Sequence, residues 1–228
     1  DHWKTLFNGF IAVLRAIDFC DSRNGLVAGD NGAILRTADG GLTWRSLANG
    51  VIGGRHMISI ALGDSSRAVV FTNGALLFRT EDGGASWTRT DLLMNGYPLC
   101  VALEGKVGYV GTSQGYIHRT TDGGATWSDP ERPANVALHD LWMFDQRHVI
   151  SVGMYGTIVS TVDSGATWEK LPAGTREHFR TIAFPDSLNG LIGGEKRERP
   201  RTSPAQRVYD PRACRQHAAP HGREPDFE

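Results

Sequence analysis

Short apolar runs alternate along this chain with clusters of Gly, Asn, Asp and Ser. In the first unit the runs are "LRAIDFC" (14–20), "GLVAG" (25–29), "AILRT" (33–37) and "TWRSL" (43–47), separated by "DSRN", "DNG" and "ADGG". Short apolar runs bounded by turn residues are typical of β-strands. No stretch of ten or more residues places its apolar positions at helical spacing. The pattern therefore predicts units of four strands.

The same unit recurs three more times and then begins a fifth time. The runs read "ISIAL", "AVVFT", "LLFRT" and "SWTRT" in the second unit, "CVAL", "GYVGT", "YIHRT" and "TWSD" in the third, and "LWMF", "VISVG", "TIVST" and "TWEKL" in the fourth. Aligned on one tryptophan per unit, the repeats are 43, 40 and 41 residues apart. At 180–194, "RTIAFPDSLNGLIGG" matches "RAIDFCDSRNGLVAG" at 15–29 almost position by position. This period is that of propeller blades. We predict an all-β fold, a β-propeller of four-stranded antiparallel blades with four whole blades and partial blades at both ends.

The propeller is predicted to cover residues 1–194, and residues 195–228 to form a tail. At the N-terminus, "HWKTL" (2–6) has the tryptophan and leucine spacing of "TWEKL" and is predicted to be the last strand of a blade. The tail holds five of the ten prolines, one of the 28 glycines, and eight Lys and Arg against six Asp and Glu. Such a composition favours disorder. A basic arm for an acidic partner and a truncated or out-of-frame end remain alternatives.

One turn motif occurs four times, at 37–44, 80–87, 120–127 and 161–168. Its pattern, Thr/Ser-x-Asp-x-Gly-x-Thr/Ser-Trp, resembles the Asp-box, also called the bacterial neuraminidase repeat. That resemblance implies a hairpin turn between the third and fourth strands, on the rim away from the active face. The residue types agree, because the aspartates can accept N–H bonds within the turn, the glycines suit positive φ and the tryptophans can anchor neighbouring blades. We predict a structural role for Asp39, Trp44, Asp82, Trp87, Asp122, Trp127, Asp163 and Trp168.

The opposite rim then carries the turns between second and third strands and the connections between units. Connections that vary on a rigid frame are the usual place for function. Arg15, His139 and Arg180 share one position at the entrance to the first strand of a unit, and Arg55 and His56 lie close to it. These residues are predicted to form a positive cluster at the mouth of the central channel and to contact a protein partner. Unrelated solvated side chains are the alternative.

Charge and composition narrow the classes of function. A net charge of −1 and a pI near 6.8 indicate no basic surface for nucleic acid. The sequence has no apolar run long enough to span a membrane, and "DHWKTLFNGF" lacks the features of a signal peptide. Cys20, Cys100 and Cys214 lack the spacing of metal ligands. We therefore predict no catalytic, metal or cofactor site and no cofactor.

Whole units, written "G-x-x-G-x-x-G-x-I-x-R-T-x-D-G-G-x-T-W", resemble the photosystem II assembly and stability factor family and its non-photosynthetic bacterial relatives. The resemblance covers residues 1–194. It implies a non-catalytic scaffold whose arginines hold a protein partner, in that family a membrane-protein subunit. It also implies export to the periplasm, the thylakoid lumen or the cell exterior. That family has seven blades and this chain shows four whole units, so the total blade number stays open.

A glycoside hydrolase of the sialidase or xyloglucanase type, which uses the same boxes, is the alternative. A sialidase needs an arginine triad and a tyrosine activated by a glutamate. The tyrosines of the repeats, Tyr97, Tyr109, Tyr116 and Tyr155, have no convincing glutamate partner in the sequence. A glucanase needs two carboxylates that face a groove, and the candidates in suitable loops are Asp91, Asp129, Glu131, Asp140 and Glu177. A generic recognition module of a larger exported protein is a third possibility. We favour binding over catalysis.

Overall fold

The computed structural model describes residues 12–47, 52–74, 76–91, 94–128, 130–186 and 189–195. Their strands form antiparallel sheets that follow one another in chain order, here called blades 1 to 5. The strands are, in blade 1, β1 (Leu14–Phe19), β2 (Gly25–Gly29), β3 (Ile34–Thr37) and β4 (Arg45–Ser46); in blade 2, β5 (Met57–Leu62), β6 (Ala68–Thr72), β7 (Leu76–Thr80) and β8 (Thr88–Asp91); in blade 3, β9 (Pro98–Glu104), β10 (Val107–Thr112) and β11 (Ile117–Thr120); in blade 4, β12 (Leu138–Met143), β13 (Val149–Gly153), β14 (Thr157–Thr161) and β15 (Glu169–Leu171); and in blade 5, β16 (His178–Ala183) and β17 (Leu191–Glu195).

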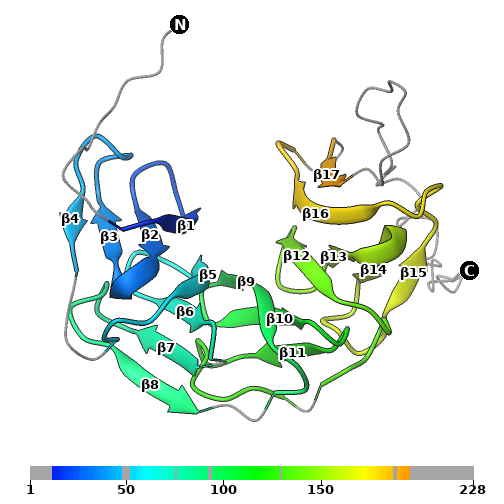
Figure 1. The fold of residues 1–228 in the computed structure, drawn as a ribbon, viewed down its shortest axis with the longest axis horizontal. Helices are drawn as coiled ribbons and strands as arrows, with labels where there is room; N and C mark the ends of the chain where they lie inside the picture. The colour runs from blue at the N-terminus through cyan, green and yellow to red at the C-terminus, as the bar shows by residue number, and fades with distance from the viewer. Residues whose placement is uncertain are drawn as a thin grey trace, which may run out of the picture.

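Figure 1 looks along the axis around which the blades are arranged. The first strand of each blade lies innermost, and the later strands follow outward in the order of the chain. The blades form an open ring, with β1 on one side of the opening and β16 and β17 on the other. This is a β-propeller arrangement, so the fold predicted from the repeat period is confirmed.

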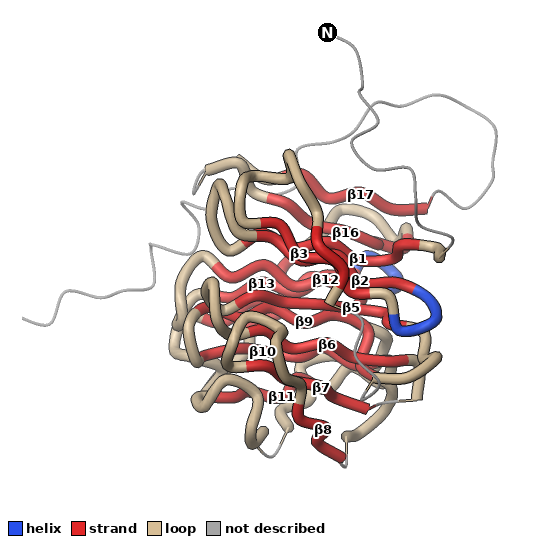
Figure 2. The backbone as a smooth tube through the Cα atoms, turned by 90° about the vertical axis from the view of Figure 1, so that its left-hand side faces the viewer, coloured by secondary structure: helices blue, strands red, loops and turns tan. Residues whose placement is uncertain are grey.

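The two ends of the strands carry different turns. Single 3-10 turns, η1 (Asp30–Gly32) and η2 (Met154–Gly156), join the second and third strands of blades 1 and 4. Figure 2 shows these turns toward one side of the stacked strands. Because adjacent strands are antiparallel, the Asp-box turns between third and fourth strands lie at the opposite end. The structure therefore has the two distinct rims that the repeat predicts.

Apolar residues cover both faces of the inner blades, because each sheet packs between two neighbours. We call the face that packs on the preceding blade the leading face, and the opposite face the trailing face. At the junction of blades 4 and 5, Phe179, Ile182 and Phe184 of the leading face of blade 5 form one buried cluster with residues of blade 4. The ring centroids of Phe144 and Phe184 lie 4.6 Å apart across that junction. These junctions supply most of the core.

Blade 3 differs from the prediction, because the run "TWSD" does not form a fourth strand within the described residues. Only an isolated bridge between Ile117 and Glu131 follows β11 there. Pro130 precedes Glu131 and has no N–H to donate, which interrupts a ladder at this point. The outer edge of blade 3 is accordingly less regular than that of blades 1, 2 and 4.

The ends of the chain lie mostly outside the described residues. The predicted strand at 2–6 and residues 196–228 of the predicted tail both fall there. Glu195, which the sequence places at the start of the tail, is the last residue of β17.

No helix among the described residues has the length and apolar character needed to cross a bilayer.

Candidate functional site

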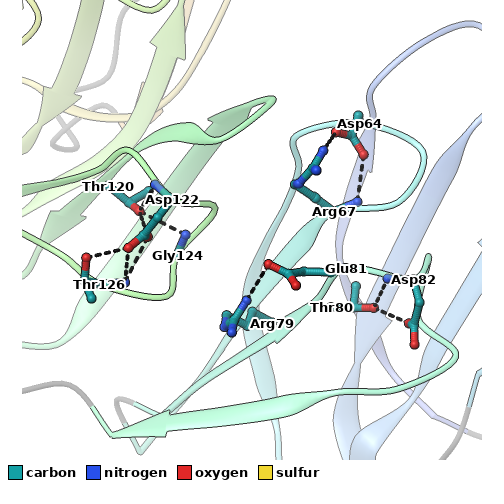
Figure 3. Close-up of polar contacts among 10 residues, drawn as sticks. All are labelled: Asp64, Arg67, Arg79, Thr80, Glu81, Asp82, Thr120, Asp122, Gly124 and Thr126. Atoms are coloured by element: carbon teal, nitrogen blue, oxygen red, sulfur yellow. Dashed lines mark hydrogen bonds and ion pairs between the residues drawn. The ribbon is translucent and has the colours of Figure 1, made fainter.

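In each Asp-box turn, the polar side chains form hydrogen bonds within the turn itself. In the third box, Asp122 accepts hydrogen bonds from the hydroxyl of Thr120 at 2.8 Å, the N–H of Thr126 at 2.9 Å and the hydroxyl of Thr126 at 2.5 Å. The N–H of Gly124 donates to the hydroxyl of Thr120 at 2.9 Å. Figure 3 shows this closed set of contacts beside part of the second box. The same pattern recurs around Asp39, Asp82 and Asp163.

These contacts hold the box carboxylates in the ionised form. At Asp39, Asp82 and Asp163 the pKa falls to about 2. The largest cause in each case is the hydrogen bond from the hydroxyl group of the residue four positions later in the box. At Asp122 burial acts in the opposite direction, and the hydrogen bonds from Thr126 and Thr120 outweigh it, so the pKa also falls to about 2. A carboxyl group with such a pKa is a poor proton donor near neutral pH.

The box glycines have the backbone conformation that the sequence predicts. Gly41, Gly84, Gly124 and Gly165 have φ between 84° and 89°, in the left-handed region. The fourth box departs from the others, because Ser164 occupies the position before its glycine and has φ of 66°. A residue with a Cβ is strained there.

The box tryptophans contribute unequally to the junctions. Trp87 is buried and packs in a cluster with residues of blade 1. Trp127 and Trp168 are half-buried and contact the rings of Phe71 and Tyr109 of their preceding blades, at centroid distances of 6.1 and 6.4 Å. Trp44 belongs to blade 1 and contacts Phe19 of its own blade instead. Of the four box tryptophans, Trp87 is fully buried and the other three are partly buried.

A cleft of about 680 Å³ occupies the centre of the ring. The first strands of all five blades line it, and its lining includes Arg15, His139 and Arg180 from the predicted cluster. It also includes Asp18 of β1 and Asp140 of β12. This cleft is the natural place for a partner that crosses several blades.

Two residues of the predicted cluster, Arg15 and His56, meet at the edge of blade 1. Arg15 donates to both carboxylate oxygens of Asp30 in η1, the Nη2 bond at 2.9 Å, and His56 Nδ1 lies 2.8 Å from the same carboxylate. The hydrogen bond from Arg15 is the largest cause that lowers the pKa of Asp30 to about 2. Arg55 contributes to this cluster through its backbone: its carbonyl oxygen accepts a hydrogen bond from the N–H of Gly32 at 2.8 Å. The side chain of Arg55 is exposed.

The second group of predicted residues spans blades 4 and 5. Arg180 donates from Nε to Glu195 at 3.0 Å, and its Nη1 lies 3.0 Å from Nε2 of His139. Burial lowers the pKa of His139, and the charge of Arg180 lowers it further. The ordinary pKa of histidine is near 6.5, so His139 is mostly neutral at pH 7 and accepts the arginine's hydrogen bond.

Acidic partners make the cluster less positive than the sequence predicts. Asp30 faces Arg15, and Glu195 faces Arg180. The sequence shows Asp30 in the turn "DNG", but its pairing depends on strand register, and the composition of the C-terminal segment places Glu195 in the tail. The structure therefore assembles two polar clusters, one on each side of the ring opening, in place of one positive patch.

Two further carboxylates of the cleft connect neighbouring blades. Asp18 accepts a hydrogen bond from the N–H of Leu62 in blade 2 at 2.7 Å. Asp140 accepts from the N–H of Ile182 at 2.8 Å and from the hydroxyl of Thr181 at 2.9 Å in blade 5. Burial raises the pKa of both carboxyl groups. Sequence reasoning missed Asp18 altogether.

The other candidate acids of a glycosidase do not join Asp140 in the described structure. Glu131 is exposed at the outer edge of blade 3, and Glu177 is partly buried in the connection before β16. The side chains of Asp91 and Asp129 lie outside the described residues. Among the described residues, no three His, Cys, Asp or Glu side chains are grouped to hold a metal ion.

The repeat tyrosines are divided between the core and the rim that carries η1 and η2. Tyr109 is buried, donates to the carbonyl of Gln146 at 3.0 Å and accepts from Arg119 at 3.2 Å. Tyr97 and Tyr155 are exposed in connections of the rim that holds Arg15 and His139. Tyr116 is partly buried beneath the guanidinium of Arg132, 4.9 Å from its ring centroid.

Comparison with known proteins gives both a family and a fold. The family model described as "Photosynthesis system II assembly factor YCF48" matches residues 1–132. Among solved structures, one described as YCF48 bound to D1 peptide is 18% identical, covers 81% of this chain and 91% of its own, and has a TM-score of 0.47. YCF48 from Cyanidioschyzon merolae is 18% identical, with coverages of 84% and 95% and a TM-score of 0.49.

A propeller enzyme shares the fold. The GH74 enzyme of Niastella koreensis is 20% identical over 78% of this chain and 33% of its own, with a TM-score of 0.65. At that identity the likeness concerns the fold alone. No curated protein sequence matches this chain significantly.

Proposed function

Because this chain belongs to the family of the Photosynthesis system II assembly factor YCF48, we propose that it is a non-catalytic propeller that binds a protein partner over its central cleft. The partner class we propose is a peptide segment of a membrane-protein subunit, as expected of an assembly factor. The tryptophan and aspartate of each box act as scaffold on the far rim. The contacts come from the rim that holds the two polar clusters.

The observation that carries this proposal is the placement of Arg15 and Arg180 at the edge of the cleft. Each guanidinium is held by an acid of its own rim, Asp30 or Glu195, which fixes its direction. Arg15 uses Nε and Nη2 in that contact, and Arg180 uses Nε and Nη1 for Glu195 and His139. One terminal nitrogen of each arginine is left without a hydrogen bond to the described residues. A fixed arginine with a spare donor suits a peptide carbonyl or carboxylate.

Exposed aromatic residues on the same rim add to this surface. Tyr155 is exposed, has φ of 57°, and stacks edge-on with His178 at 4.8 Å between ring centroids. Its backbone N–H donates to Nδ1 of His178 at 3.2 Å, which ties the turn that carries Tyr155 to blade 5. Tyrosine and arginine are enriched among the residues that dominate protein interfaces. Arg180 and Tyr155 would supply such contacts from neighbouring blades.

The glycosidase alternative has weaker support. Its best-placed acid, Asp140, accepts hydrogen bonds from Thr181 and Ile182 and so connects two blades. A general acid or base must instead reach the substrate within hydrogen-bond distance.

The test is a peptide array that spans the D1 sequence, probed with the purified chain, followed by fluorescence anisotropy on the segments that bind. Arg15→Glu combined with Arg180→Glu should weaken binding at least about tenfold, the loss expected for one charged hydrogen bond. The control is Arg45→Glu combined with Lys170→Glu, which makes the same charge change on the outermost strands β4 and β15. Arg180→Ala leaves Asp30 paired and should weaken binding without affecting blade 1. Equal loss in the control, or no loss in either cleft variant, would contradict the proposal.

A further inference from the structure

Tyr155 has a backbone conformation that suits small residues better than large ones. Its φ and ψ are 57° and 37°, in the left-handed region. In η1, the equivalent turn of blade 1, Asn31 has nearly the same angles, 58° and 31°. Asparagine adopts this conformation readily, whereas a bulky residue there is an outlier. Because asparagine makes the same turn in blade 1, the turn itself does not require a tyrosine in blade 4.

Contacts on both sides of Tyr155 keep the turn in this conformation. The N–H of Met154 donates to the carbonyl of Ala137 at 3.0 Å, and the N–H of Gly156 donates to the carbonyl of Glu177 at 2.7 Å. These bonds tie η2 to the connections before β12 and β16. Strained residues that their surroundings hold in place are concentrated at functional sites. The strain at Tyr155 therefore points to a role for its side chain.

The ring of Tyr155 contributes little to the core. It is 57% exposed and does not belong to the apolar cluster at the junction of blades 4 and 5. Its aromatic contact among the described residues is with His178, whose ring is inclined to it by 62°. Two inclined rings, one of them mostly exposed, form an open corner on the rim. We call Tyr155 and His178 the aromatic corner.

The aromatic corner lies beside Arg180. Burial is the largest cause that lowers the pKa of His139, and the charges of Arg180 and His178 lower it further, so the three side chains share one small region of the rim. Nη1 of Arg180 is 3.0 Å from Nε2 of His139. A peptide whose carbonyl group or carboxylate is bound by Arg180 therefore has a neighbouring side chain within reach of the aromatic corner.

We infer that the aromatic corner determines the specificity of the proposed site, by binding a proline or aromatic side chain of the peptide segment that Arg180 holds. This inference rests on the proposed function and adds the class of peptide that the site selects. Flat apolar rings pack well on tyrosine, and aromatic-lined surfaces recognise proline-containing segments in other domains. Such rigid side chains lose little conformational freedom when they bind. Contact with Tyr155 adds selection by side chain to the charge recognition that an arginine supplies.

The experiment compares Tyr155 variants of the full chain by fluorescence anisotropy, with a segment that the peptide array has selected. Tyr155→Asn removes the ring and supplies the residue that η1 has at this position, so it should weaken binding at least about fivefold without lowering the melting temperature. The conservative variant Tyr155→Phe keeps the ring and should restore the binding that Tyr155→Asn loses. A lower melting temperature of Tyr155→Asn would assign the ring a structural role and overturn the inference.

Two controls make the result specific. Tyr97→Asn removes a tyrosine that is 65% exposed on the same rim and lies outside the aromatic corner, so it should weaken binding clearly less. In the peptide, replacement of the proline or aromatic residue by serine should weaken binding to the wild type at least about fivefold. The same replacement should have little further effect on Tyr155→Asn, because both changes remove one contact.

The outcomes separate this inference from the proposed function. Equal losses from Tyr97→Asn and Tyr155→Asn, additive effects of the peptide and protein changes, or bound segments that contain no proline or aromatic residue would overturn the inference. Weaker binding by Arg180→Ala, together with wild-type binding by Tyr155→Asn, would retain the proposed function and reject only the aromatic corner. A wild-type chain that binds no segment would overturn both.

Discussion

Arg36, at the end of blade 1's third strand, donates hydrogen bonds to two carbonyl groups of blade 2, from Nη1 to Gly83 at 2.5 Å and from Nη2 to Ser65 at 2.7 Å. Gly83 lies in the second Asp-box, so one box turn is tied directly to the next. Hydrogen bonds that involve a charged group contribute more than neutral ones.

Replacement of Arg36 should therefore weaken the junction of blades 1 and 2. Arg36→Met keeps the aliphatic part of the side chain and removes both bonds, and should lower the free energy of unfolding by about 1–3 kcal/mol. Urea denaturation measures the change. Arg45→Met, on the outermost strand, should change it by less than about 0.5 kcal/mol; comparable effects of the two would contradict the junction role.

The box tryptophans should differ in their effect on stability. Trp87→Ala removes a buried ring from the junction of blades 1 and 2 and should cost about 3–5 kcal/mol. Trp44→Ala should cost clearly less, because Trp44 is half-buried and contacts only Phe19 of its own blade among the described aromatic rings. Urea denaturation of both variants tests this ranking. Equal losses of unfolding free energy would show that the burial of a box tryptophan does not determine its contribution to stability.

The Asp-box carboxylates should make the protein sensitive to acid. Their pKa values are near 2 in the folded chain, below the ordinary value of 3.8. A lowered pKa stabilises the fold fully above the unfolded value and loses that contribution as pH falls toward 2. The urea midpoint of the wild type should therefore fall between about pH 4 and pH 2. Asp82→Asn should have a lower midpoint at pH 7 and a shallower fall, and an unchanged slope would count against this origin.

Asp140 should have the opposite dependence on pH. Burial raises its pKa above 3.8, so the folded chain binds this proton more tightly than the unfolded chain does. Its contribution is present below the unfolded pKa and is lost as pH rises through the folded pKa. Asp140→Asn retains an oxygen that can accept from Ile182 and removes the buried charge. The variant should gain stability relative to the wild type as pH rises above about 4, and a parallel pair of stability curves would refute this.

The strands and their turns were predictable because they depend on neighbours in the sequence. The repeat places β1, β2 and β3 close to their observed bounds, and the box glycines have the positive φ that their turn requires. Blade 3 departs from the repeat where Pro130 interrupts the ladder, a local cause that the sequence already contained.

The candidate site was less predictable, because it depends on contacts between distant residues. The repeat correctly placed Arg15 and Arg180 at one register, but their partners, Asp30 and Glu195, follow only from the paired strands. The burial of the box tryptophans also depends on packing between blades. Trp127 and Trp168 each contact a preceding blade and are nevertheless half-buried, as Trp44 is, so the shared motif does not predict which tryptophan is fully buried.

A closed propeller holds every blade between two neighbours, whereas blades 1 and 5 border the opening of this ring (Figure 1). Such a chain behaves as a linear array, whose members unfold most readily at its ends. Amide hydrogen exchange should therefore be slowest at the buried centre of blades 2 and 3, for example at Val70 and Val110, and faster at Ile192. Arg15 and Arg180 belong to the two terminal blades. A partner that contacts both arginines should reduce local unfolding of blades 1 and 5 together. The binding of a short peptide should therefore slow amide hydrogen exchange in all five blades.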